Sequence, residues 1–317
     1  MRSRSRIAAW VVGLTVTAVV ATLGCGGGGG TDSGIQLNGI AFGAGTFVAV
    51  GDSDRIFANP GTGWTPIITG TNTLQDVVWS RTLRRFVAVG AGLVVTADVD
   101  SSSGVPQLVN VQTQSPTAST LYSVAERDGQ LIAVGDGGTI LASTDGAVWT
   151  PRASGTTETL DAVAFSNDGQ RVVAVGSGAN VVISDDGGLT WQSTFVQFDD
   201  ADITNLTGVA FGPNGWVVSG ANGILLQSDD PTQWRLVGNG ILPNLNAVVL
   251  VQGLYTVLGE KGRILTSPDG ITYADIVSNT GQFLFDSAYG NGTYFVVGSG
   301  GRALMSFDGA IYQDTKI

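Results

Sequence analysis

The sequence predicts an all-β fold, a seven-bladed β-propeller of four-stranded antiparallel blades, and three observations lead to it. One sequence motif is repeated seven times: an apolar strand that starts with leucine, a strand that ends in glycine, and a turn of the form S-x-D-G-x-x-W. The glycines are 39 to 45 residues apart, and the serine position always follows eight residues later. Repeats of about 40–50 residues made of short strands are typical of propellers, with one blade per repeat.

Three landmark positions locate the strands in each repeat. The leucines are Leu37, Leu74, Leu121, Leu160, Leu206, Leu245 and Leu284; the glycines are Gly51, Gly90, Gly135, Gly176, Gly220, Gly259 and Gly298; the serines or their replacements are Asn59, Asp98, Ser143, Ser184, Ser228, Ser267 and Ser306. Each landmark lies beside a short run of Val, Ile, Ala or Phe bounded by Gly, Asp or Asn, which is a strand signal.

The fourth repeat shows the four strands of a blade. We expect them at Leu160–Phe165, Arg171–Gly176 and Asn180–Ser184, and around Trp191. A single blade cannot bury both of its faces, so the seven repeats must stack around an axis. The chain starts on an innermost strand and ends on an outermost one, so closure of the ring by a strand borrowed from the other terminus is not obvious, although residues 31–36 could supply a short one.

The first 24 residues have the pattern of a secretory signal. Arg2, Arg4 and Arg6 precede an uncharged stretch that runs from residue 7 to residue 23. A basic segment followed by an apolar one is typical of export signals. The alternatives are an ordinary cleaved signal peptide and an uncleaved anchor helix of borderline length.

Cys25 is the only cysteine of the chain, and it follows the sequence Ala-Thr-Leu-Gly. This segment resembles a bacterial lipobox, with Thr22 in place of the usual leucine. Residues 25–34 would then be an acylated cysteine and a Gly-rich tether, and residues 35–317 the propeller. We therefore expect an exported protein, lipid-anchored to the bacterial cell envelope and most simply to the outer membrane.

The charge balance restricts the partners. The chain has 15 basic and 26 acidic residues, and removal of residues 1–24 would leave a side-chain charge of about −14. Nucleic acid requires a basic surface, so it is not expected as a partner. Anionic headgroups are disfavoured for the same reason, which leaves the lipid as the membrane link. The expected partner is an envelope protein or a polysaccharide.

The residue inventory also restricts the chemistry. The chain has no histidine, so Ser-His-Asp catalysis and histidine-ligated metals are excluded, and no phosphate-binding loop occurs. We expect no cofactor and no metal. Glycoside hydrolysis by a carboxylate pair remains open, as does calcium binding through oxygen ligands. Glutamates are scarce, so the candidate acid/base set is Asp76, Asp161 and Asp286, near the start of the inner strands.

The repeated turn phrase carries a resemblance. Residues 184–191 read S-x-D-x-G-x-T-W, a full Asp-box, and four other repeats are one residue shorter. Here the chain resembles the sialidase-superfamily propellers. Its L-x-x-V-A-F and F-V-A-V-G phrases are similar, more closely, to the photosystem II stability/assembly factor family. The resemblance spans residues 37–317 and implies a propeller. It also implies that the repeated aspartates accept hydrogen bonds within their turns: Asp145, Asp186, Asp230, Asp269 and Asp308.

Departures from the repeat are better candidates for a binding site. Four residues after the landmark glycine, repeats 1, 6 and 7 carry Arg55, Arg263 and Arg302, with Glu260 and Lys261 in the same turns. These repeats become neighbours when the ring closes, so the arginines should line one sector of one face. They could clamp an anionic ligand or partner. The alternative is that each pairs with a nearby acid on the surface.

These observations favour a non-catalytic binding or assembly scaffold. The alternative is a carbohydrate-active hydrolase of the Asp-box type, with the three inner aspartates as its catalytic candidates.

Overall fold

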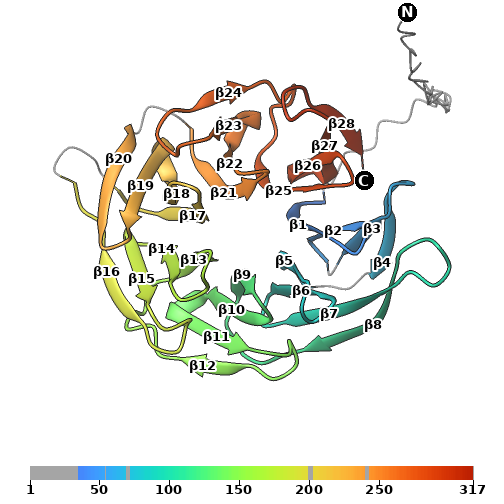
Figure 1. The fold of residues 1–317 in the computed structure, drawn as a ribbon, viewed down its shortest axis with the longest axis horizontal. Coiled ribbons are helices and arrows are strands. Elements are labelled where there is room, and N and C mark those ends of the chain that lie inside the picture. Colours follow the sequence, from blue (N-terminus) through green and yellow to red (C-terminus); the bar gives the residue numbers. More distant parts are fainter. Residues whose placement is uncertain (1–34, 54, 69–71, 199–202, 240–242, 317) are drawn as a thin grey trace, which may run out of the picture. The chain divides into compact units, whose positions relative to one another are not determined.

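The computed structural model describes residues 35–53, 55–68, 72–198, 203–239 and 243–316. These residues form seven four-stranded antiparallel sheets, and the strands of each sheet follow one another in chain order. Figure 1 shows the seven sheets arranged as blades around a common axis, with the first strand of each blade innermost. The predicted seven-bladed propeller is therefore confirmed. The predicted signal, Cys25 and tether lie outside the described residues. No helix among the described residues is long and apolar enough to cross a bilayer.

Blades 1 to 4 are built from the first sixteen strands. These are β1 (Leu37–Gly43), β2 (Thr46–Gly51), β3 (Ile56–Asn59) and β4 (Thr65–Ile68); β5 (Leu74–Ser80), β6 (Arg85–Gly90), β7 (Val94–Asp100) and β8 (Gln107–Gln114); β9 (Leu121–Arg127), β10 (Gln130–Gly135), β11 (Thr139–Ser143) and β12 (Thr150–Arg152); β13 (Leu160–Phe165), β14 (Val172–Gly176), β15 (Asn180–Ser184) and β16 (Gln192–Phe195). The strands predicted for repeat 4 agree with this, except that β14 begins one residue later than expected.

Blades 5 to 7 complete the ring. Their strands are β17 (Leu206–Gly212), β18 (Gly215–Gly220), β19 (Ile224–Asp230) and β20 (Gln233–Asn239); β21 (Leu245–Val251), β22 (Leu254–Gly259), β23 (Ile264–Ser267) and β24 (Ala274–Ile276); β25 (Leu284–Gly290), β26 (Thr293–Gly298), β27 (Arg302–Ser306) and β28 (Gln313–Lys316). Four turns between second and third strands contain a single 3-10 turn: η1 (Asp136–Gly138), η2 (Ala221–Gly223), η3 (Glu260–Gly262) and η4 (Ser299–Gly301).

The core consists of apolar clusters between neighbouring blades. Among the described residues there are seven clusters, one for each blade-to-blade interface. The interface between blades 7 and 1 has its own cluster, in which the Phe47 and Phe295 rings meet edge-on with centroids 4.8 Å apart. Trp64 contacts Phe295 in the same way at 5.3 Å. The ring is therefore closed by packed side chains, and every described strand of blade 1 comes from the N-terminal end of the chain.

The landmark glycine is required by a close approach of two backbones. At all seven positions, an added Cβ would lie closer than 3.0 Å to the carbonyl oxygen of the residue before the landmark leucine. That same carbonyl accepts a hydrogen bond from the amide that follows the glycine, as in Asp136 N–H to Thr120 O at 2.9 Å. Only glycine permits this approach, which fixes the start of the first strand against the end of the second.

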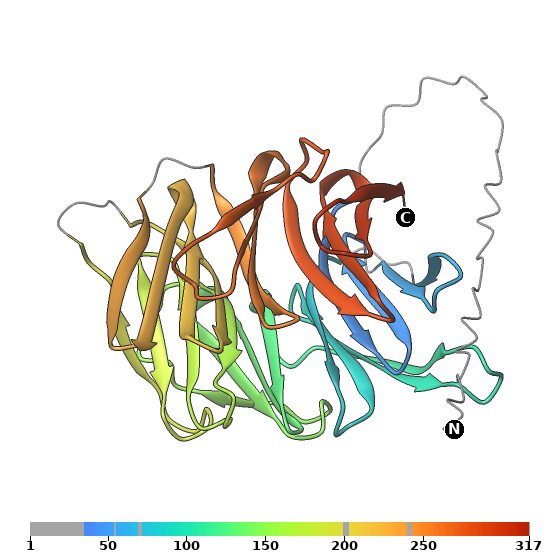
Figure 2. The same ribbon diagram turned by 45° about the horizontal axis from the view of Figure 1, so that its top comes forward.

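Blade 2 departs from the other blades at its outer edge. Its last two strands form a long hairpin, β7 and β8, in place of the compact turn phrase. Figure 2 shows this hairpin reaching beyond the outline of the ring. Side chains of this hairpin, including Val99, Leu108 and Val111, pack against the cluster between blades 1 and 2.

Candidate functional site

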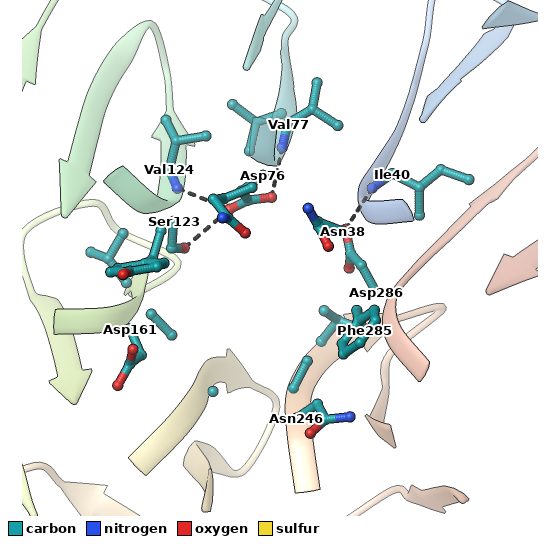
Figure 3. Close-up of a pocket in the computed structure, with 18 of the residues that line it drawn as sticks. Asn38, Ile40, Asp76, Val77, Ser123, Val124, Asp161, Asn246, Phe285 and Asp286 are labelled. Atoms are coloured by element: carbon teal, nitrogen blue, oxygen red, sulfur yellow. Dashed lines mark hydrogen bonds between the residues drawn. The ribbon is translucent and has the colours of Figure 1, made fainter. Parts of the chain in front are cut away.

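The first strands of the seven blades line a central cavity of about 650 Å³. Asp76, Asp161 and Asp286 all lie in its wall, so the structure brings the three candidate carboxylates into one pocket (Figure 3). Glu126 also lines the cavity, and no lysine or arginine is found among the described residues around it. The cavity is therefore acidic.

Every first strand carries one extra residue directly after its landmark leucine. The pairing register with the second strand skips this residue in all seven blades. Such a bulge redirects a side chain, and all seven of these side chains line the central cavity. We call them the bulge ring: Asn38, Gln75, Tyr122, Asp161, Thr207, Asn246 and Phe285. Of these seven residues, only Asp161 was predicted from the sequence as a site residue. The signal of the ring is a position, mostly polar, that interrupts an otherwise apolar strand.

Three members of the bulge ring tie neighbouring blades together. The Asn38 amide donates to the carbonyl oxygen of Leu74 at 2.8 Å. In the same way, Thr207 Oγ1 donates to the Leu245 carbonyl at 2.6 Å, and the Asn246 amide donates to the Leu284 carbonyl at 2.9 Å. In each case the acceptor is the landmark leucine of the next blade. In blades 1, 5 and 6, a hydrogen-bond donor at this position therefore joins one blade to the next.

Asp76 and Asp286 perform a related task one residue further along. Asp76 accepts hydrogen bonds from Val124 N–H at 2.9 Å and from Ser123 Oγ at 3.1 Å, both on the next blade. Asp286 accepts from Ile40 N–H of blade 1 at 2.8 Å. Each carboxylate also accepts from the amide of the residue that follows it, at 2.7 Å. Figure 3 shows the two side chains on either side of Asn38. Both therefore hold blades together.

Burial raises the pKa of both carboxyl groups. The pKa of Asp76 rises from 3.8 to about 6, mainly through burial, and the hydrogen bonds from Val124 and Val77 offset part of this. Burial also raises the pKa of Asp286 well above its usual value, and the negative charge of Asp76 raises it further. The two carboxyls therefore oppose each other's ionisation.

Asp161 differs from these two because one of its oxygens has no partner. Its Oδ2 is buried and accepts no hydrogen bond within the described part of the chain. Burial raises the pKa of Asp161 from 3.8 to about 6, the charge of Asp136 adds to this, and the Asn205 side chain acts in the opposite direction. Both acids act on Tyr122, whose pKa is also raised, first by burial and then by Asp136.

The repeated aspartates occupy the opposite ends of the strands, in the turns between third and fourth strands. Asp145 Oδ1 accepts hydrogen bonds from Ala147 N–H at 2.7 Å and Val148 N–H at 2.8 Å. Asp269 and Asp308 accept the equivalent pairs of turn amides. The aromatic residue closes the turn from below, as where Trp149 Nε1 donates to the Gly146 carbonyl at 3.2 Å. These hydrogen bonds lower the pKa of the three carboxyl groups.

The full Asp-box turn has one more hydrogen bond than the shorter copies. Asp186 accepts from the amides of Leu189 and Thr190 at 3.0 and 2.9 Å, and from Thr190 Oγ1 at 2.6 Å. These bonds lower its pKa to about 2, with the Thr190 hydroxyl as the largest cause. Asp230 is different: its carboxylate accepts one turn amide, from Thr232 at 3.3 Å, and also faces Arg171 at 3.4 Å.

The three arginines do lie at one repeated turn, but two of them are engaged. Arg263 pairs with Asp275, and Arg302 pairs with Asp314; in both cases the acid lies on the fourth strand of the same blade. Arg55 is half-buried beside the start of β3, and Lys261 is exposed at the tip of η3. Glu260 accepts a hydrogen bond from the Asn244 amide at 2.9 Å. For Arg263 and Arg302 the structure agrees with the alternative, in which each arginine pairs with a nearby acid; binding of an anion by the three arginines stays a prediction.

No metal site is formed by the described side chains: no three His, Cys, Asp or Glu residues among them come together as metal ligands would.

Comparisons with known proteins agree with this architecture. A family profile described as the DUF6242 beta propeller domain matches residues 66–206. None of the curated proteins matches the chain. A solved structure titled "YCF48 bound to D1 peptide" is similar with a TM-score of 0.62 at 15% identity, over 86% of this chain and 91% of that one. A chain from "Crystal Structure of Mitotic Checkpoint Complex" reaches a TM-score of 0.63 at 13% identity, over 89% of this chain and 87% of that one. At these identities the likeness is one of fold.

Proposed function

We propose that this protein is a non-catalytic binding scaffold and that the bulge ring is the surface that recognises its partner. One observation carries the proposal. Seven structurally equivalent positions hold six different residue types around one cavity, while the leucines beside them are the same in every blade. In a repeat protein, framework positions are constrained by packing, whereas a varied ring of equivalent positions is where a partner can be distinguished.

The composition of the ring indicates the class of partner. Tyr122 and Phe285 are the aromatic members, and amide, hydroxyl and carboxyl groups occupy the other positions. Aromatic anchors beside polar groups suit a protein segment, and the cavity is acidic, which disfavours nucleic acid. One solved relative of the fold is described as bound to a peptide, which supports the same class of partner. A polypeptide of the envelope is therefore the proposed partner.

The test compares the two ends of the propeller. The double variant Tyr122→Ala/Phe285→Ala should lose most of the partner recovered by cross-linking and affinity capture from the producing cells. The matched control is Phe307→Ala, because Phe307 is 71% exposed in the turn between β27 and β28, at the other end of the strands. Equal loss in both variants, or no loss in the double variant, would contradict recognition at the bulge ring.

Lipid anchoring is part of the same proposal and rests on the sequence. If Cys25 is the acylated residue, Cys25→Ser should release the protein from membranes or block its processing. Cys25 is the only cysteine, so no other thiol could replace it. Unchanged processing and membrane retention in this variant would remove the anchor from the proposal and leave the scaffold untouched.

A glycoside hydrolase remains the second candidate, because three carboxyl groups with raised pKa lie in one pocket. A general acid in such enzymes needs a raised pKa. Against this, the oxygens of Asp76 and Asp286 are occupied by amides of the framework. Release of reducing sugar from envelope polysaccharide by the purified protein, abolished by Asp286→Asn in a folded variant, would establish the hydrolase instead.

A further inference from the structure

Asp161 occupies a position at which other blades place a hydrogen-bond donor. Asn38, Thr207 and Asn246 are its equivalents in blades 1, 5 and 6, and each donates to the carbonyl oxygen of the next landmark leucine. The register skips Asp161 as it skips the other members of the bulge ring. The equivalent acceptor for blade 4 is therefore the carbonyl oxygen of Leu206, which begins β17.

An ionised aspartate cannot form this bond, because a carboxylate has no hydrogen to donate. The protonated acid can, since its O–H is a strong donor. The structure leaves Asp161 Oδ2 buried and without a hydrogen-bond partner among the described residues, so this oxygen is free to carry the donated proton. An unpaired buried oxygen is costly, and a proton shared with a neighbouring carbonyl removes that cost.

We propose that Asp161 is a pH-sensitive latch between blades 4 and 5: its protonated carboxyl donates a hydrogen bond to Leu206 O, and loss of that proton to solvent removes the bond. The inference is independent of the proposed partner. It assigns to one blade interface a bond that the interfaces after blades 1, 5 and 6 hold permanently with amide or hydroxyl donors.

The charged surroundings favour the protonated acid. β13 packs against β9, β10, β14, β17 and η1. Of these, η1 supplies Asp136 and β9 supplies Tyr122, which face Asp161; Glu126 and Arg127 lie at the far end of β9. β10, β14 and β17 contain no ionisable side chain. The described groups that act on Asp161 are therefore negative or neutral, and burial together with Asp136 raises its pKa to about 6.

The raised pKa of Asp161 determines how the stability of the fold changes with pH. The pKa of Asp161 is higher in the folded chain than its ordinary value of 3.8, so the folded state holds the proton more tightly. The stabilisation from the latch is then fully present below about pH 4 and is lost as the pH rises through about 6. Because each pKa unit is a factor of ten, the unfolding equilibrium constant should change by at most about a hundredfold over this range.

Two variants of the full chain test the latch. Asp161→Asn places a permanent donor at the position, as in blades 1 and 6. Its urea midpoint should be closer to the wild type at pH 4.5 than at pH 8, exceed the wild type at pH 8, and vary less with pH than the wild-type midpoint does. Asp161→Ala removes both donor and charge, so at pH 4.5 its midpoint should fall below that of Asp161→Asn. The difference between wild type and variant isolates Asp161 from the other buried acids.

Each outcome decides one part of the proposal. If Asp161→Asn follows the wild type at every pH, titration of Asp161 does not affect the interface. If the Asn and Ala variants have equal midpoints at pH 4.5, the acid is buried without donating a hydrogen bond, and the latch is wrong. The ¹³Cγ resonance that is present in the wild type and absent from Asp161→Asn should titrate near pH 6; a midpoint near 3.8 would overturn the proposal independently of stability.

Discussion

The propeller holds two sets of aspartates whose chemistry is opposite. In the inner strands, burial raises the pKa of Asp76 and Asp161 to about 6. In the outer turns, hydrogen bonds lower the pKa of Asp145, Asp186 and Asp269. Asp76 accepts backbone amides as the turn aspartates do, so hydrogen bonding by itself does not separate the two sets. Exposure to water separates the two sets: the turn carboxylates stay hydrated, whereas the carboxyl groups that line the central cavity lose their water.

Aspartate therefore stabilises two kinds of contact in this fold, one within a blade and one between neighbouring blades. A turn aspartate stabilises its own blade through amides two to four residues away. An inner aspartate such as Asp76 reaches an amide 48 residues away on the next blade. The first contact is local and forms with the turn, while the second forms only when blades meet. Removal of an inner aspartate should therefore affect assembly of the ring as well as its stability.

The largest expected effect is the loss of an inner carboxylate. Asp76→Ala would leave the Val124 amide and the Ser123 hydroxyl without their acceptor at the channel wall. An unpaired buried donor costs about 1–3 kcal/mol, so we expect a loss of roughly 2 kcal/mol in the free energy of unfolding, measured by urea denaturation. Asp76→Asn, which keeps one acceptor oxygen, should lose less. Equal stability of Asp76→Ala and wild type would show that Asp76 does not join blades 2 and 3.

Much of this inner arrangement follows from the repeat, and part of it does not. The seven landmark leucines and glycines fixed the blades and their strands, because both positions are set by packing inside the repeat. The three inner aspartates were found from their distance to the leucines. Their partners were not, because Val124 and Ile40 belong to other repeats, and no local pattern shows which amide a carboxylate will face. Pairing of Arg263 and Arg302 with acids was one of two alternatives for the arginines, and nothing in the sequence showed which acid each guanidinium would face.

The two sets of aspartates together determine the pH at which the protein is most stable. The inner carboxyls have a raised pKa, so their contribution is fully present below about 4 and is lost as the pH rises through about 6. The turn carboxyls have a lowered pKa, so their contribution is present above about 4 and is lost as the pH falls through about 2 for Asp186. Thermal unfolding across pH 2–8 should therefore show a maximum near pH 4 to 5. A maximum at pH 7 or above would mean that the inner acids are ionised in the folded protein without cost.

A smaller effect is expected in the outer turns. Asp145→Ala removes the acceptor for two turn amides, but these amides are exposed and water can replace the carboxylate. The loss should be about 1 kcal/mol, the net contribution of a typical hydrogen bond. Urea denaturation of Asp145→Ala beside Asp76→Ala gives the comparison directly. If the turn variant loses more than the inner one, exposure is not what separates the two sets.

The smallest effect on stability is expected at Arg263 and Arg302, in the turns between second and third strands. Arg263 and Arg302 pair with Asp275 and Asp314, and their side chains are 24% and 30% exposed. Ion pairs near the surface contribute about 0–1 kcal/mol, because water already solvates both partners well. The double variant Arg263→Gln/Arg302→Gln should therefore keep the urea midpoint almost unchanged. It also separates two readings of the arginines, because a clamp on an anionic partner would be lost without any loss of stability. Partner capture could instead fall in this variant while Tyr122→Ala/Phe285→Ala has no effect. The partner would then bind at the turns between the second and third strands, and the bulge ring would serve only to join the blades.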